Sequence, residues 1–188
     1  MILLVGLGNI GDKYKLTRHN VGFLFIDYIA SFYDFPPFKT NFKSLITEKN
    51  INSKKVILQK PQTFMNLSGE AVQPLCNFYK IPSDNVIVIQ DDIDLSFNDI
   101  RYKTNSGDGG QKGIRDIQNK IGKDIHRIKI GIGRPSNSNH DISDYVLGNF
   151  NKSEIQDIEK TLYDFSLELP HLLEKDFKKF IENIKNKN

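Results

Sequence analysis

Two polar side chains that could do chemistry stand in one glycine-rich stretch near the start of the chain, between Gly6 and Gly22. Asn9 carries an amide that can donate and accept hydrogen bonds, and His19 carries an imidazole that can take up a proton near neutral pH. The stretch follows a short, branched apolar run, which predicts a buried strand over residues 1–6. Because ligands bind beyond the carboxyl ends of strands in open α/β sheets, we expect Asn9 and His19 to face a ligand.

The same stretch matches the dinucleotide-binding pattern G-x-G-x-x-G at Gly6, Gly8 and Gly11. That pattern requires a helix to begin at the third glycine, where the helix N-terminus holds a pyrophosphate. The residues after Gly11 show no helical apolar period until about Asn20. Dinucleotide binding therefore stays an alternative interpretation, and so does a histidine that only caps a helix or fills the core.

Three further polar segments carry candidate groups. One contains Asn66, one begins at Asp91, and one is rich in glycine over residues 107–113. A carboxylate beside a histidine holds one ring tautomer and stabilises the imidazolium, which leaves the other ring nitrogen free to act as a general base. No serine lies in a G-x-S-x-G elbow, and Cys76 falls in an expected helix. A pair of His19 and Asp91 would therefore point to water as the attacking group.

The composition is that of a globular protein with one domain. The 188 residues are enough for one full core, and no apolar run approaches the ~20 residues of a membrane span. We expect no signal peptide, and the single cysteine excludes an internal disulfide and fits a reducing compartment. The four histidines are scattered without an H-x-x-x-H spacing, so we expect no metal centre. The acidic run that starts at Asp91 is more typical of a strand end than of a cation site.

Basic residues concentrate between Arg101 and Arg134. This segment holds nine Lys and Arg against three Asp, a local charge of +6, whereas the whole chain carries +3. Such a concentration is typical of a surface that binds a polyanion. The alternative interpretation of these charges is a solvated face of a lysine-rich protein. An alternative function is a non-catalytic RNA-binding module, which would use this basic surface without any catalytic residue.

Hydrophobic periodicity predicts a single α/β domain over residues 1–188, with a twisted, mixed and mostly parallel sheet flanked by helices. Strands are expected at residues 1–6, 42–48, 54–60, 86–90, 100–103 and 127–133, with a hairpin turn between the second and third. Helices are expected at residues 20–33, 69–80, 114–120, 151–168 and 171–184, with a break at Pro170. Residues 183–188 are expected to form a frayed polar tail.

Four motifs, in this order, resemble those of bacterial peptidyl-tRNA hydrolase over nearly the whole chain. They are G-L-G-N-x-G (6–11) leading to T-R-H-N-x-G (17–22), K-P-x-T-F-M-N-L-S-G (60–69), D-D-x-D-L (91–95), and G-G-x-x-G (109–113) followed by R-I-K-I-G-I-G-R-P (127–135). The resemblance implies a monomeric, cytoplasmic α/β enzyme that acts on peptidyl-tRNA. Such an enzyme hydrolyses the ester between the peptide and the 3′ ribose, which recycles tRNA from stalled translation. The resemblance implies neither a metal nor a cofactor.

The resemblance also implies roles for individual residues. His19 would activate water, Asp91 would hold it in its basic form, and Asn9 would help to distinguish a blocked peptidyl ester from a free aminoacyl ester. Residues that would line the substrate cleft or approach tRNA are Tyr14, Asn20, Phe64, Met65, Asn66, Lys103, Gly109, Gly110, Lys112 and Lys129.

The chain departs from the family's pattern at three places. Lys112 stands where the family usually has asparagine, and lysine donates hydrogen bonds but cannot accept them. Two interpretations stay open: Lys112 contacts a phosphate, or it points to solvent. Gln90 replaces the small residue or histidine that often leads into Asp91. Residues 136–140 lack the lysine that the family tends to place there, so one tRNA contact is expected to be missing or moved.

Overall fold

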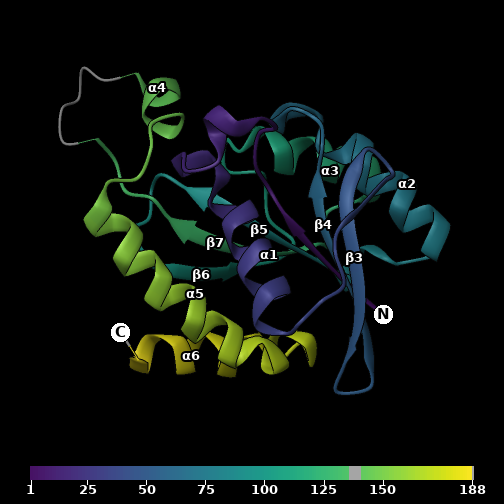
Figure 1. The fold of residues 1–188 in the computed structure, drawn as a ribbon. Helices are drawn as coiled ribbons and strands as arrows, with labels where there is room; N and C mark the ends of the chain where they lie inside the picture. The colour runs from purple at the N-terminus through teal and green to yellow at the C-terminus, as the bar shows by residue number, and fades with distance from the viewer. Residues whose placement is uncertain (136–140, 188) are drawn as a thin grey trace.

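The structure is a computed structural model that describes residues 1–135 and 141–187. A seven-stranded sheet with the order β2-β3-β4-β1-β5-β7-β6 runs through the molecule (Figure 1). The strands are β1 (Ile2–Gly6), β2 (Lys39–Asn41), β3 (Ser44–Ile51), β4 (Lys54–Pro61), β5 (Val86–Asp92), β6 (Ile100–Lys103) and β7 (His126–Gly131). The α-helices are α1 (Val21–Phe32), α2 (Gly69–Tyr79), α3 (Lys112–Ile121), α4 (Ile142–Val146), α5 (Lys152–Leu173) and α6 (Phe177–Lys187). Short 3-10 turns lie at η1 (Asp12–Tyr14), η2 (Arg18–Asn20), η3 (Met65–Leu67) and η4 (Ser83–Asn85).

The expected mixed sheet is confirmed. The central strands β4, β1, β5 and β7 are parallel to one another, and antiparallel pairs flank them at both edges. At one edge β2 and β3 extend the sheet from β4, and at the other β6 pairs with β7. Parallel pairs therefore form the centre of the sheet rather than most of it. The carboxyl ends of β1, β5 and β7 meet at one edge, which is where the chain must place a ligand site.

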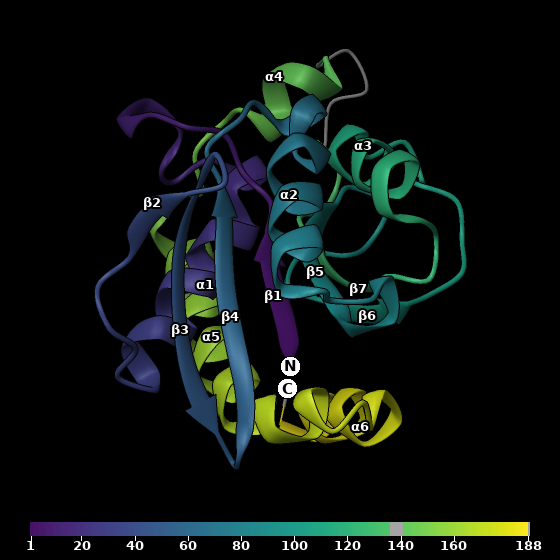
Figure 2. The ribbon, with the colours of Figure 1, turned by 90° about the vertical axis from the view of Figure 1, so that its right-hand side faces the viewer.

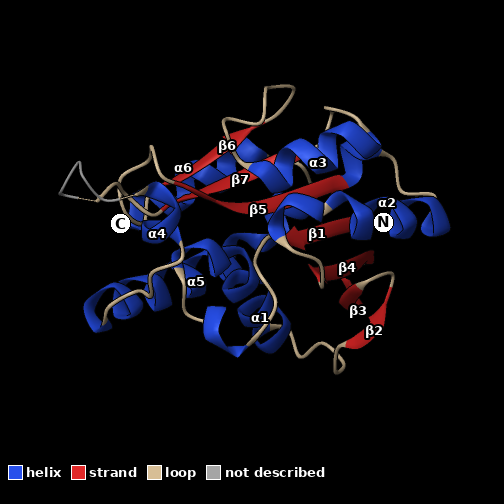
Figure 3. Cartoon of the chain, turned by 90° about the horizontal axis from the view of Figure 1, so that it is seen from above, coloured by secondary structure: helices blue, strands red, loops and turns tan. Residues whose placement is uncertain are grey.

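Two hydrophobic cores lie on the two faces of this sheet. Alternate residues of β1 face opposite sides: Ile2 and Leu4 join one core, and Leu3 and Val5 join the other. The helices α1, α5 and α6 cover the first face, and α2 and α3 cover the second (Figures 2 and 3). Because both faces are buried, β1 is apolar throughout and β5 is apolar from Val86 to Ile89, without the alternation of a half-exposed strand.

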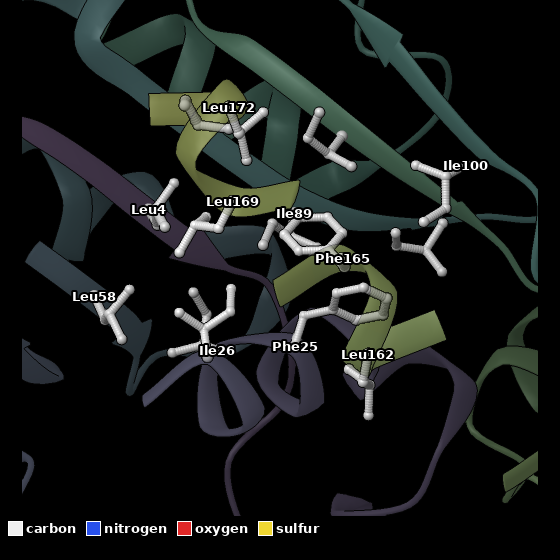
Figure 4. Packing of buried hydrophobic residues seen from close by; sticks show 14 of the residues in the cluster. Leu4, Phe25, Ile26, Leu58, Ile89, Ile100, Leu162, Phe165, Leu169 and Leu172 are labelled. Carbon is white, nitrogen blue, oxygen red and sulfur yellow. The ribbon is translucent and has the colours of Figure 1, made fainter. Parts of the chain in front are cut away.

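Aromatic side chains tie the helices of the first face together. Phe25 from α1 and Phe165 from α5 meet edge to face, with ring centroids 4.9 Å apart (Figure 4). Phe165 makes the same kind of contact with Phe180 of α6, at 5.0 Å. All three side chains are fully buried, and such edge-to-face pairs add about 0.5–1.5 kcal/mol beyond the area that they bury. The C-terminal helices are therefore part of the core.

The predicted helix break at Pro170 is wrong, because α5 continues through it to Leu173. A proline has no N–H, so it leaves the carbonyl of the residue four positions earlier without its helical partner. Here that carbonyl belongs to Ser166, and the hydroxyl of Tyr33 donates a hydrogen bond to it at 2.7 Å. A side chain from the end of α1 therefore replaces the missing bond, and the helix continues.

The C-terminal residues also differ from expectation. Residues 183–187 belong to α6, where Asn183 and Lys187 donate hydrogen bonds to the carboxylate of Glu168, both at 2.7 Å. The predicted frayed tail is therefore wrong for these residues, and residue 188 lies outside the described ones. Two short elements were not predicted: the edge strand β2 and the one-turn helix α4. The predicted hairpin between β3 and β4 is confirmed, with left-handed backbone at Asn52 and Ser53.

Candidate active site

His19 and Asp91 form a hydrogen-bonded pair at the carboxyl end of β5. The ring nitrogen Nδ1 of His19 lies 2.7 Å from Oδ2 of Asp91. Asp91 is buried and is the second-last residue of β5, and the His19 side chain is 19% exposed. With the Nδ1 proton facing the carboxylate, Nε2 of the neutral ring carries the free lone pair. The predicted pairing of these two residues is confirmed.

Glycines let the segment that carries His19 come close to the sheet. A Cβ atom on Gly22 would lie 2.4 Å from the backbone nitrogen of Leu7 and 2.5 Å from the carbonyl oxygen of Ile89. A Cβ atom on Gly6 would lie 2.3 Å from the carbonyl oxygen of Gly22. Only residues without a Cβ allow this approach. The first turn of α1 can therefore rest on β1 and β5, with His19 above the end of β5.

Arg18 fixes the same segment from the other side. Its guanidinium donates two hydrogen bonds of 3.1 Å to the carboxylate of Glu154 and one of 3.0 Å to the carbonyl of Asn149. It also lies over the ring of Tyr145, 4.5 Å from the centroid. These contacts join η2 to α4 and the start of α5. His19 therefore lies between Arg18, which is held by these contacts, and Gly22, which rests on the strands. Sequence reasoning missed Arg18, since its partners lie more than 120 residues away.

The surroundings of His19 act on its pKa in opposite directions. Burial of the ring favours the neutral form, but the charge and the hydrogen bond of Asp91 together outweigh it. The positive charge of Lys112 again favours the neutral form. The net result is a pKa of His19 raised above its ordinary value of 6.5. The neutral ring is therefore a stronger base than an ordinary imidazole.

Asn9 has its orientation fixed by three hydrogen bonds. Its backbone N–H donates to Oδ1 of Asn20 at 2.8 Å, and its carbonyl accepts from Nδ2 of Asn20 at 2.9 Å. Its own side-chain Oδ1 accepts a hydrogen bond of 3.0 Å from the backbone N–H of Met65. With the oxygen occupied in this way, the amide offers its NH₂ group as a donor. The structure therefore brings Asn9, Asn20 and Met65 together.

The second oxygen of Asp91 contacts Gln111. The Nε2 of Gln111 lies 3.2 Å from Oδ1 of Asp91, and Oε1 of Gln111 accepts from the backbone N–H of Ile114 at 3.0 Å. Gln111 is the N-cap residue of α3, and its side chain is buried. Sequence reasoning did not single out this contact. Its one sequence signal is a polar side chain directly before a helix that opens at a glycine-rich loop.

A cavity of about 370 Å³ opens beside the His19–Asp91 pair. Its walls come from three segments: the end of β5, the glycine-rich loop that leads into α3, and α4. The lining residues that matter for the chemistry are His19, Asp91, Gly109, Gly110, Lys112 and Ser143. Of the four loops that we expect to converge, this cavity brings together those that carry His19, Asp91 and the glycine-rich segment.

The other predicted cleft residues do not line this cavity. Asn9 and Asn20 line a separate cavity of about 440 Å³, between η1, α1 and the end of β4. Phe64 is 56% exposed, and Asn66 follows it on the exposed turn η3. Tyr14 lies half-buried on η1. Met65, in contrast, is buried and contacts Nε2 of Gln111 through its sulfur at 3.1 Å.

The basic segment is less positive in space than in sequence. Lys129, Arg134 and Arg101 form ion pairs with Asp92, Asp94 and Asp99, three acids that lie outside the segment. Arg115 and Lys120 pair with Asp108 and Asp116. Arg127 is buried. Lys103 and Lys112 are exposed and form no ion pair within the part of the chain that the structure describes. The expectation that a tRNA contact is missing or moved in residues 136–140 lies outside the described residues.

The dinucleotide pattern has another explanation here. The chain after Gly11 forms the single 3-10 turn η1, and α1 begins only at Val21. The third glycine therefore opens no helix that could hold a pyrophosphate. Gly8 instead makes room for Phe23, whose ring would lie 2.7 Å from a Cβ atom at that position.

Other candidate centres are weak in the described residues. Cys76 is buried, and burial raises the pKa of its thiol to about 11, so it is a poor nucleophile. Over residues 1–135 and 141–187, no group of three or more His, Cys, Asp or Glu side chains is placed to hold a metal ion. In the same residues, no helix has the length and apolarity to cross a bilayer.

Comparison with known proteins identifies the family. The family profile described as peptidyl-tRNA hydrolase matches residues 3–188. A peptidyl-tRNA hydrolase of Bdellovibrio bacteriovorus is 50% identical over 155 residues, which are 82% of this chain and 83% of the relative. One from Rickettsia prowazekii is 47% identical over 178 residues, covering 92% of this chain and 96% of the relative. The crystal structure of peptidyl-tRNA hydrolase from Acinetobacter baumannii superposes with a TM-score of 0.90 at 34% identity, covering 98% of this chain and 94% of that one. The chain belongs to the peptidyl-tRNA hydrolase family.

Proposed function

We propose that this protein hydrolyses the ester bond between a peptide, or an N-blocked aminoacyl group, and the 3′ end of tRNA. The observation that carries the proposal is the His19–Asp91 pair, which borders a cavity at the carboxyl edge of the sheet. Family membership supplies the substrate class, because the relatives are named peptidyl-tRNA hydrolases. The released tRNA would return to translation.

His19 would act as the general base toward water. Its Nδ1 proton faces Asp91, so Nε2 takes a proton from water while the water oxygen attacks the ester carbonyl. The tetrahedral intermediate then collapses, the bond to the ribose 3′ oxygen breaks, and the imidazolium returns its proton to that oxygen. Asp91 stabilises the imidazolium during these steps. Ser143 lines the cavity, but among the described residues its hydroxyl makes no hydrogen bond to His19, which supports water as the nucleophile.

Asn9 would select blocked esters over free aminoacyl esters. Its Oδ1 is occupied by the backbone N–H of Met65, so the amide offers donors to the substrate. A peptide or acetyl carbonyl accepts such a donor, whereas a free α-ammonium group has only donors of its own. The mismatch would disfavour aminoacyl-tRNA, because a site that expects a hydrogen-bond partner rejects a ligand that lacks it.

The tRNA end would lie over the exposed residues around the two cavities. Phe64 offers an exposed ring on which a base can stack, and Met65 and Asn66 follow it on η3. Asn20 lines the second cavity, and Tyr14 lies half-buried on η1. Gly109 and Gly110 let the ligand approach the backbone, and Lys112 offers a charge at the cavity wall. Lys103 is the better placed of the two predicted phosphate lysines, since Lys129 already pairs with Asp92.

We further propose that the protein acts as a cytoplasmic monomer and without a metal or cofactor, as the family resemblance implies. Retention of activity after dialysis against EDTA, and elution at the monomer position in size-exclusion chromatography, would support these two points. Loss of activity that added metal restores would contradict the absence of a metal.

The decisive experiment compares two substrates. The purified protein is incubated with N-acetyl-aminoacyl-tRNA and, separately, with the same tRNA carrying the free aminoacyl group, and released tRNA is scored on acid gels. We expect rapid release from the blocked ester and release close to the spontaneous rate from the free one. No release from the blocked ester would contradict the proposed function.

A further inference from the structure

Both carboxylate oxygens of Asp91 are engaged, and each contacts a different segment. Oδ2 accepts from His19 on η2, and Oδ1 accepts from Nε2 of Gln111 at the start of α3. Asp91 is 6% exposed and Gln111 is 9% exposed, so water contributes little to either contact. A carboxylate held at one oxygen alone can rotate about its side-chain bonds, whereas one held at both oxygens cannot.

The orientation of the Gln111 amide follows from its other end. Oε1 accepts from the backbone N–H of Ile114, which is one of the free donors in the first turn of α3. A flipped amide would point NH₂ at that N–H and point its oxygen at the Asp91 carboxylate, and both contacts would be repulsive. The helix start therefore forces Nε2 toward Asp91. The sulfur of Met65, 3.1 Å from the same Nε2, closes the remaining side.

We propose that Gln111 is a positioning residue for hydrolysis, which holds the Asp91 carboxylate in the orientation that keeps the Nδ1 proton of His19 bonded. Gln111 touches neither the water nor the ester in this account, and it acts through Asp91. The inference rests on the proposed hydrolase function.

The variant Gln111→Ser separates the two roles of this side chain, which are the capping of α3 and the hydrogen bond to Asp91. Serine is a good N-cap, so Gln111→Ser keeps an acceptor for the first turn of α3, but it is too short to reach Asp91. We expect kcat for N-acetyl-aminoacyl-tRNA to fall about tenfold, with KM and the melting temperature close to wild type. The matched control is Gln73→Met. Gln73 donates to the carbonyl of Lys120 at the other end of α3, far from Asp91, and its loss should leave kcat unchanged.

A double-mutant cycle tests whether Gln111 acts through Asp91. In the Asp91→Asn background, Gln111→Ser should lower kcat less than twofold, because the carboxylate that it positions is gone. The same tenfold loss in both backgrounds would overturn the proposal, and so would a loss in Gln111→Ser that is matched by Gln73→Met. Wild-type protein without any hydrolysis would instead refute the proposed function itself, so the two failures are distinguishable.

Discussion

Nδ1 of His19 lies 2.7 Å from Oδ2 of Asp91, across 72 positions of sequence. The contact exists because two glycines let the start of α1 rest on the strands, and because β5 continues as far as Asp92 instead of ending before its acids. The relationship fixes which ring nitrogen carries the proton. It also raises the pKa of His19 above 6.5, although burial and Lys112 oppose the shift.

Replacement of Asp91 by asparagine should slow hydrolysis and shift its pH dependence. Without the carboxylate the pKa of His19 falls, so the acid limb of kcat/KM against pH should move to lower pH. The asparagine amide can also donate to Nδ1, which puts the ring proton on the wrong nitrogen, and kcat should fall by about 10²–10⁴-fold. The measurement is a pH–rate profile of both proteins. An acid limb at the wild-type position would mean that Asp91 does not set the pKa of His19.

Replacement of Lys112 by alanine should shift the acid limb the other way. The lysine charge disfavours the imidazolium, so its removal raises the pKa of His19. As the pH is lowered, the variant should therefore lose activity at a higher pH than wild type does. If Lys112 also contacts a phosphate, KM should rise more at low salt than at high salt. Lys112→Asn should behave in the same way as the alanine variant.

The control for Lys112 is Lys123→Ala, which removes an exposed lysine beyond the other end of α3. It should change neither the acid limb nor KM. A change in KM that does not depend on salt, or no change at all, would rule out a phosphate contact of Lys112. The position of the acid limb would still test, separately, whether the charge of Lys112 lowers the pKa of His19.

Lys103 and Lys129 should differ in their effect on tRNA affinity. Lys103→Ala removes an exposed charge, so the slope of log K against log salt should become shallower by about one. Lys129→Ala breaks an ion pair with Asp92 instead of a phosphate contact, and the slope should stay at the wild-type value. Binding of deacylated tRNA at four or five salt concentrations measures both. Equal changes of slope would show that Lys129 leaves Asp92 to meet the tRNA.

Tyr33→Phe should destabilise the protein through helix α5. It removes the donor to the buried carbonyl of Ser166, which Pro170 cannot satisfy, and an unpaired buried acceptor costs about 1–3 kcal/mol. In a Pro170→Ala background the helix supplies its own N–H, so the same change should cost clearly less. Urea unfolding of the four proteins gives the comparison. Equal costs in both backgrounds would show that Tyr33 does not replace the missing helical bond.

Much of this architecture was predictable from local patterns. The strand at 100–103 was placed at its observed bounds, because its pattern is short and bordered by polar residues. The pairing of His19 with Asp91 was predictable because Asp91 stands at the end of one buried strand, His19 follows another, and the carboxyl ends of the two strands meet at one edge. The predicted break at Pro170 was wrong because the hydrogen bond that replaces the missing helical one comes from Tyr33, which follows α1. The contact of Gln111 with Asp91 likewise depends on tertiary packing that no local pattern contains.

The charge of the basic segment shows the same limit. A count over residues 101–134 includes every base but omits Asp92, Asp94 and Asp99, which pair with three of them across the ends of strands. Asp99 lies just outside the counted residues, whereas Asp92 and Asp94 are about 40 positions from Lys129 and Arg134 and reach them only in the folded sheet. In space, the basic segment is therefore less positive than the count over the sequence indicates.

The most direct test of this account is the turnover of N-acetyl-aminoacyl-tRNA by His19→Ala, measured beside wild type and His171→Ala. His171 lies near the end of α5, away from the cavity, so its variant should retain full activity. For His19→Ala the account predicts a loss of about 10²–10⁴-fold in kcat, with tRNA affinity and melting temperature unchanged. Turnover within a few-fold of wild type would contradict the assignment of His19 as the general base.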